Sequence, residues 1–149
     1  MKYEIMEMEE KTAAGIEIRT NNFSSDVYEA IGKLWEKFYS EAYNKIEYKI
    51  NGRALGIYTE YEGDEKEDYT MMTACEVSSD KQSSDIIIKK IPKGKYAVFT
   101  IRGDVRTAVG EFWQELWKMN LNRNFIFDYE EYCEGTIEDC VIKIYIGIK

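Results

Sequence analysis

The pattern of apolar and polar positions predicts two amphipathic helices. In the first, apolar residues recur at i, i+3, i+4, i+7, i+8 and i+11, at Val27, Ala30, Ile31, Leu34, Trp35 and Phe38. The second stripe consists of Val105, Ala108, Val109, Phe112, Trp113 and Leu116. Such spacing places one apolar stripe on each helix. We expect a helix that starts near Ser24, Ser25 or Asp26 and runs to about Tyr43, and a second helix capped by Asp104.

Alternation of apolar and polar residues predicts strands on both sides of each helix. Residues 3–20 and 86–103 each read as two short strands around a turn, and further strand candidates cover residues 53–62, 69–79, 124–133 and 139–149. The two long segments match at a constant offset of 83 residues, which pairs Ile5 with Ile88 and Ile18 with Ile101. The helices recur at an offset of 78 because the first copy has a longer loop.

The chain is therefore expected to be strand-strand-helix-strand-strand, twice over. Repeat one covers about residues 1–79 and repeat two about residues 84–149, joined by the polar stretch "SSDKQSSD". Half-chains of this size are marginal alone, so the two should share one core. We predict a single α+β domain over residues 1–149, with pseudo-two-fold symmetry, an antiparallel sheet, helices on one face and a ligand cleft at the repeat interface.

Composition narrows the chemistry. The formal net charge of -8 disfavours direct binding to nucleic acid, and the absence of His removes the usual proton shuttle and the commonest metal ligand. Three Cys without CxxC spacing suggest reduced thiols and a cytoplasmic protein. Neither a signal peptide nor a membrane span is expected. We predict no metal and no cofactor, and interpret the acidic residues 64–68 as a solvated turn.

Three carboxylates lie inside aromatic strand patterns, at Glu60, Glu76 and Glu130. Each is either an exposed strand residue or a carboxylate facing a cleft, where an unpaired charge is costly and attracts a proton or a cation. Aromatic residues make up 14% of the chain, more than one core needs, and aromatic faces beside a carboxylate can form a cage for an organic cation. Trp35 and Trp113 lie on the helical stripes and suit either the core or such a cage.

Six segments together resemble one family along the whole chain. They are "IGKLWEKF", "GIYTEYEGD", "YTMMTACEVSS", "IPKGKYAVFTIRG", "AVGEFWQELW" and "IYIGIK", and they resemble the GyrI-like small-molecule-binding domain, also the effector-binding domain of AraC-type and MerR-type multidrug-responsive regulators. The resemblance implies a duplicated fold with an aromatic cleft and a buried Glu that recognises lipophilic cations. The matching segment is residues 129–132, "YEEY", which points to Glu130. Strand parity places Glu131 on the opposite face, so either Glu could face inward.

These observations lead to a site hypothesis and three functional hypotheses. The predicted ligand-binding residues are Glu130, Trp113, Trp35, Tyr58, Phe99 and Tyr145. The first hypothesis is a stand-alone protein that senses or sequesters amphiphilic, cationic or aromatic small molecules, with a separate regulator or enzyme as a possible partner. The resemblance also implies a hydrolase of reactive cyclopropane compounds, with Glu130 and a cleft Tyr such as Tyr58. The third hypothesis is an acidic inhibitor of a nucleic-acid enzyme.

Overall fold

Eight strands form one antiparallel sheet in the order β1-β6-β8-β7-β3-β4-β2-β5 in the computed structural model, which describes residues 1–149. The strands are β1 (Glu4–Met8), β2 (Lys11–Thr20), β3 (Leu55–Thr59), β4 (Tyr69–Val77), β5 (Ile87–Ile91), β6 (Gly94–Gly103), β7 (Arg123–Gly135) and β8 (Cys140–Ile148). All the strand regions predicted from alternation are present, and β3 and β7 meet at the centre of the sheet.

Two helices follow the predicted stripes. Helix α1 spans Val27–Lys37 and continues as a π-helical turn, η1 (Phe38–Ala42), and a 3-10 turn, η2 (Tyr43–Lys45), whereas α2 is regular over Val105–Lys118. The expected helical end near Tyr43 is therefore reached, but not by α-helix alone. Asp104 caps α2 as predicted, because its side chain accepts a hydrogen bond from the Arg106 amide. Asp26 occupies the N-cap of α1 without a capping side-chain bond.

The strands β1 and β2 do not pair with each other, although only Glu9 and Glu10 separate them. Instead β1 pairs with β6 and β2 with β5, so that the segment from β1 to β2 runs antiparallel to the segment from β5 to β6. The register is constant across both pairings, from Glu4 opposite Val98 to Gly15 opposite Ile87. Two strands joined by a turn can pair with each other as a hairpin, or both can pair with another segment, as they do here. The alternation of apolar and polar residues is the same in both arrangements and does not distinguish them.

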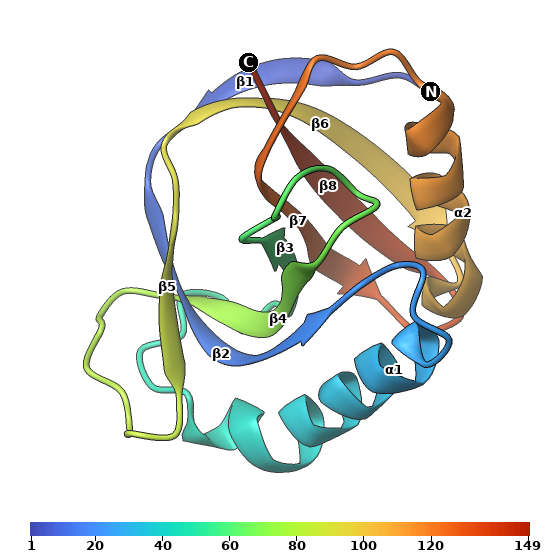
Figure 1. Cartoon of the computed structure of the whole chain (residues 1–149). Coiled ribbons are helices and arrows are strands. Elements are labelled where there is room, and N and C mark those ends of the chain that lie inside the picture. Colours follow the sequence, from blue (N-terminus) through green and yellow to red (C-terminus); the bar gives the residue numbers. More distant parts are fainter.

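Both helices cover the same face of the curved sheet (Figure 1). Helix α1 lies over β2 and β4 with Leu34 in one core cluster, and α2 packs over β6 and β8 in a second. A third cluster, which includes Ile57, Met72 and Tyr129, fills the opposite face. The helices thus leave the middle of their face, above β3 and β7, available for a cavity.

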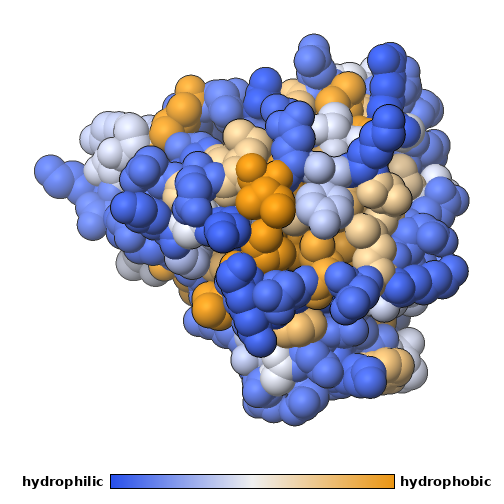
Figure 2. Space-filling view, turned by 90° about the horizontal axis from the view of Figure 1, so that it is seen from above, coloured by the Kyte–Doolittle hydropathy of each residue, from blue (hydrophilic) through white to orange (hydrophobic).

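The face of the molecule seen in Figure 2 is largely hydrophilic, with hydrophobic residues gathered near its centre. The exposed apolar side chains include Ile5 and Met6 on the edge strand β1 and Tyr28 on α1. None of the helices has the length and apolar character that crossing a bilayer requires.

Candidate functional site: an aromatic cavity around Glu130

A cavity of about 350 Å³ lies between the two helices and the centre of the sheet. Each helix contributes a wall of three residues at i, i+4 and i+8: Val27, Ile31 and Trp35 from α1, and Val105, Val109 and Trp113 from α2. Each apolar stripe therefore supplies side chains both to the core and to the cavity. Leu34 and Phe112 enter the core, whereas the neighbouring positions on each stripe face the cavity.

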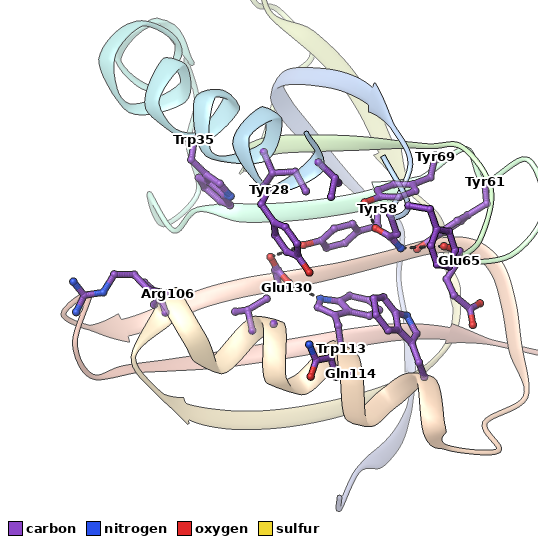
Figure 3. Close-up of a pocket in the computed structure, with 18 of the residues that line it drawn as sticks. Tyr28, Trp35, Tyr58, Tyr61, Glu65, Tyr69, Arg106, Trp113, Gln114 and Glu130 are labelled. Carbon is purple, nitrogen blue, oxygen red and sulfur yellow. Dashed lines mark hydrogen bonds between the residues drawn. The ribbon is translucent and has the colours of Figure 1, made fainter. Parts of the chain in front are cut away.

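The sheet contributes the polar and aromatic floor. Its residues come from β3, β4, β7 and the loop between β3 and β4, and they are Tyr58, Tyr61, Glu65, Tyr69, Arg123, Glu130 and Tyr132. Figure 3 shows the Glu130 carboxylate beside Tyr58 and Trp113, with dashed lines to both side chains. Tyr28 on α1 also lines the cavity. It is 82% exposed, so its aromatic ring lies at the edge of the cavity.

Glu130 is almost completely buried, with 1% of its surface exposed. Its Oε1 accepts hydrogen bonds from the hydroxyls of Tyr58 at 3.0 Å and Tyr132 at 2.8 Å. Its Oε2 accepts one longer bond, at 3.3 Å, from the indole Nε1 of Trp113 (Figure 3). Oε1 is therefore saturated with neutral donors, whereas Oε2 retains acceptor capacity within the cavity.

Burial raises the pKa of Glu130 to about 7, because removal from water penalises the ionised form more than the three hydrogen bonds favour it. No Lys or Arg forms an ion pair with Glu130. Burial and the nearby carboxylate also raise the pKa values of Tyr58 and Tyr132 well above their usual range, so both phenols stay neutral donors. The site can accordingly hold a proton or a cation, but it supplies no positive charge of its own to Glu130.

The backbone opposite Glu130 is adapted to the carboxylate. Gly56 on β3 pairs directly with Glu130 on β7, and a Cβ at Gly56 would lie 2.6 Å from Glu130 Oε1. Two residues further along each strand are Tyr58 and Tyr132, which parity places on the same face as Gly56 and Glu130. The glycine therefore gives the carboxyl group room to sit between the two phenols.

We expect Gly56→Ala to displace the Glu130 carboxylate from both phenols. Loss of these bonds in a buried site should lower the free energy of unfolding by about 1–3 kcal/mol and weaken the binding of organic cations. Urea denaturation and calorimetric titration would measure the two effects. Gly32→Ala is a suitable control, since nothing lies within 4 Å of a Cβ at this exposed helical position and the change should stabilise α1 by about 0.5–1 kcal/mol. Equal effects of the two substitutions would contradict the assigned role of Gly56.

A second polar group adjoins the cavity at Arg123. Its Nη2 donates to Asp128 Oδ2 at 2.8 Å, and its Nη1 lies 3.7 Å from Glu65 Oε2. Asp128 is fully buried and also accepts bonds from the Tyr61 hydroxyl and the Gly147 amide. The Arg123 guanidinium lies 4.3 Å from the ring centroid of Phe125. This group ties the start of β7 to the acidic loop between β3 and β4.

Four of the six predicted ligand-binding residues, Trp35, Tyr58, Trp113 and Glu130, line the cavity. Phe99 and Tyr145 do not. Phe99 packs under α2 against Phe112, with ring centroids 5.1 Å apart. Tyr145 points to the opposite face of the sheet, where its ring stacks on that of Tyr129 at 4.4 Å. An aromatic residue on a strand gives no indication in sequence of whether it fills a core or lines a cavity.

The other candidate carboxylates lie outside the cavity. Glu131 is on the opposite face, 3.3 Å from Arg53, which decides the choice between the two adjacent Glu residues in favour of Glu130. Glu60 pairs with Lys89, and Glu76 lies 3.8 Å from Lys11. Both therefore have partners that Glu130 lacks.

Several cavity residues were not identified from sequence. Tyr132 could have been found, because it lies two positions after Glu130 on the same strand and must share its face. Tyr61, Tyr69 and Arg123 gave no comparable signal. They converge through a loop and a strand end that come together only in the folded chain.

Comparison with known proteins yields a family and a shared fold. The model of the Cass2 family, described as "integron-associated effector binding protein", matches residues 4–148. No protein among those with curated functional descriptions matches the chain.

Three solved structures are similar over nearly the whole chain. An integron cassette protein from the mobile metagenome of Vibrio cholerae is 26% identical, with a TM-score of 0.80 over 99% of this chain and 95% of the other. The protein SAV2435, solved bound to tetraphenylphosphonium, is 19% identical, with a TM-score of 0.82 over 100% and 94%. The C-terminal domain of EcmrR is 17% identical, with a TM-score of 0.56 over 100% and 99%. The latter two similarities establish the fold alone.

Proposed function

Because the chain belongs to the Cass2 family of integron-associated effector binding proteins, we propose that its effector is an amphiphilic organic cation held in the cavity between α1 and α2. The observation that carries this proposal is Glu130, a buried carboxylate without a cationic partner. A ligand with a positive charge would supply the missing counter-ion, and its apolar body would be buried against the cavity walls.

The aromatic residues around Glu130 suit a diffuse positive charge. Tyr58 and Trp113 pack with ring centroids 5.0 Å apart, and Trp35 and Tyr132 with centroids 5.5 Å apart. Rings in this arrangement stabilise a quaternary cation by about 0.5–2 kcal/mol each, while a strongly hydrated metal ion gains little from them. The tetraphenylphosphonium bound to SAV2435, a protein of the same fold, is a ligand of this chemical class.

We attribute the position of the cavity to a duplication, with one domain over residues 1–149 built from repeats of about 1–79 and 84–149. The counterparts in the two repeats are β1 and β5, β2 and β6, β3 and β7, and β4 and β8. When each strand is replaced by its counterpart, the strand order is the same as before, read from the opposite edge of the sheet. Val27, Ile31 and Trp35 then correspond to Val105, Val109 and Trp113. In this proposal the pseudo-two-fold axis passes near the Gly56–Glu130 pair, so the cleft lies at the seam and one carboxylate serves both halves.

The biological role that fits these features is ligand sensing or sequestration in the cytoplasm. All three cysteines are free, which suits a reducing compartment. The resemblance of the sequence to the GyrI-like domain suggests a relation to the effector-binding domains of transcription regulators, those of AraC type among them. We propose a separate regulator or enzyme as the protein partner, since the net charge of -8 disfavours direct contact of this chain with nucleic acid.

A comparison of a cation with its uncharged isostere tests the proposal. Phenyltrimethylammonium and tert-butylbenzene have nearly the same shape and differ in charge. We expect the cation to bind at least about tenfold more tightly in calorimetric titration, since a charge contact in a desolvated site outweighs the cost of removing the cation from water. Equal affinity for the two compounds would refute charge recognition, although the cavity could still hold apolar ligands.

Substitution of Glu130→Gln removes the charge while keeping the side-chain size. The preference for phenyltrimethylammonium over tert-butylbenzene should disappear in this variant, with the apolar contribution retained. Tyr145→Phe is a matched control, because Tyr145 lies on the opposite face of the sheet, and it should keep the preference.

The alternative use of Glu130 and Tyr58 in hydrolysis stays a prediction, which product analysis after prolonged incubation with a reactive cyclopropane compound would test.

A further inference from the structure

Glu65 is a second carboxylate at the cavity, outside the group around Glu130. It belongs to the acidic loop between β3 and β4, and its side chain is 25% exposed. Neither oxygen of its carboxylate has a hydrogen-bond partner, and both are accessible to solvent. Its one ion pair is long, with 3.7 Å between Glu65 Oε2 and Arg123 Nη1. Glu65 therefore offers a ligand two acceptor atoms that the protein itself leaves free.

Arg123 does not neutralise Glu65, because its guanidinium is already bonded to another carboxylate. Its Nη2 donates to Asp128 Oδ2 at 2.8 Å, and Asp128 is fully buried. One guanidinium thus faces two carboxylates, of which Asp128 is the nearer. The group keeps an excess negative charge on the side of Glu65, where an added cation would lower the electrostatic energy.

Hydrogen bonds from two asparagines fix the loop that carries Glu65. The Asn22 side chain donates to the Glu65 carbonyl at 3.0 Å and accepts a bond of 2.6 Å from the Tyr69 hydroxyl. The Asn21 side chain donates to Asp68 Oδ1 at 3.0 Å. These bonds attach the loop to the segment that joins β2 to α1. Glu65 is therefore held at the cavity, although it lies in a strongly acidic turn.

Exposed aromatic rings also line the cavity. Phe23 directly follows Asn22, Tyr28 lies on the first turn of α1, and Trp117 lies one turn beyond Trp113 on α2. Large apolar side chains that are exposed together are typical of a binding surface. Aromatic rings and an accessible carboxylate are the two features that an organic cation needs. The cavity therefore offers this combination at Glu65 as well as at Glu130.

The two carboxylates lie on different sides of Trp113. The indole Nε1 is 3.3 Å from Glu130 Oε2, whereas the guanidinium carbon of Arg123, the partner of Glu65, is 5.8 Å from a ring centroid of the same indole. Figure 3 shows the side chains of Glu65 and Glu130 apart, on opposite sides of Trp113. A ligand that contacts both carboxylates must therefore extend along the cavity past the indole.

We propose that Glu65 forms a second anionic subsite of the cavity, which selects elongated organic dications with one positive group at Glu130 and the other at Glu65. This inference rests on the proposed function, since Glu130 must hold the first charge. It adds a second charge and a length to the description of the ligand.

A series of dications and matched monocations tests the subsite. In each dication, two trimethylammonium groups end a chain of four to ten methylene groups, and in its monocation one of them is replaced by tert-butyl. Identical ends give a dication a statistical factor of two. We expect the dication to bind the wild-type protein about 6- to 20-fold more tightly at the best chain length, because a shorter chain cannot reach both carboxylates. A ratio of two or less at every length would overturn the proposal.

Glu65→Gln removes the second charge while keeping the side-chain size. The ratio should fall to about two at every chain length in this variant. Glu67→Gln is the matched control, because it removes one charge from the same loop at a residue outside the cavity, and it should keep the wild-type ratio. Titration at physiological salt screens the attraction of a dication to distant acidic residues. An unchanged ratio in Glu65→Gln would show that the second charge is bound elsewhere and would refute the subsite.

The results for Glu65 and Glu130 can be told apart. Each ratio is taken within one protein, so a general loss of stability in a variant does not imitate it. If phenyltrimethylammonium binds more tightly than tert-butylbenzene but the dications gain only twofold, the cation site at Glu130 stands and the Glu65 subsite does not. If phenyltrimethylammonium has no advantage, the proposed function itself fails.

Discussion

Affinity for an organic cation should rise about tenfold per pH unit between pH 5 and pH 6 and level off above pH 7. The cation binds the ionised carboxylate, and with a Glu130 pKa of about 7 only about one molecule in a hundred is ionised at pH 5. Binding at pH 5 should accordingly be about 100-fold weaker than at the plateau. Calorimetric titration of tetraphenylphosphonium at pH 5, 6, 7 and 8 would measure this dependence.

The absence of His makes this experiment unusually direct. No other side-chain type ordinarily changes charge between pH 5 and 8, and burial raises the pKa values of Cys75, Cys133 and Cys140 away from this range. Binding at pH 6 should also release about 0.9 protons per cation, measurable from titrations in buffers of different ionisation enthalpy. Glu130→Gln should bind weakly and without pH dependence. A pH-independent affinity in the wild-type protein would contradict the role of Glu130 as the cation's counter-ion.

Without ligand, the free energy of unfolding should fall by about 2–3 kcal/mol between pH 5 and pH 8, because the folded Glu130 has a pKa raised from 4.5 to about 7. The folded state holds a proton in this range that the unfolded state has already lost. The resulting stabilisation is complete below about pH 4.5 and disappears as the pH rises through 7. Urea denaturation at several pH values would measure it.

The matched variant separates this effect from general acid or base effects. Glu130→Gln is expected to be less stable overall, because its amide group must replace an acceptor of three hydrogen bonds, yet its stability should hardly vary between pH 5 and 8. Carboxylates with lowered pKa values, such as Asp104 at about 2, titrate below this window. The same loss of stability in wild type and Glu130→Gln would show that another group is responsible.

Much of the architecture was predictable because it follows from local periodicity. The stripes from Val27 to Phe38 and from Val105 to Leu116 predict the helices, and alternation predicts the strands, since burial of one face imposes these periods on any sequence. The side-chain bond of Asp104 to the backbone is equally local. The extent of regular helix was less predictable, because the π-helical turn at Phe38 carries no distinct pattern.

Residues at the cavity were predictable only in part. Glu130 was identified from the segment "YEEY" through its resemblance to a known family. Alternation along a strand assigns residues to two opposite faces of the sheet, but it does not tell which of these faces the helices cover. The same ambiguity explains Tyr145, whose alternating pattern is as regular as that of Tyr58 although it faces the other way. Phe99 was misplaced for a different reason, since it lies on the helix face but under α2.

By itself, the sequence determined the order of elements, the two matching helices and the absence of any histidine that would titrate in the same pH range as Glu130. Only the tertiary structure decided that β1 pairs with β6, that Gly56 faces Glu130 and that Arg123 reaches the same cavity. Periodicity depends on neighbours a few positions apart along the chain. These contacts depend on strand register and on segments dozens of residues apart, whose choice of partner is made by the packing of the whole sheet.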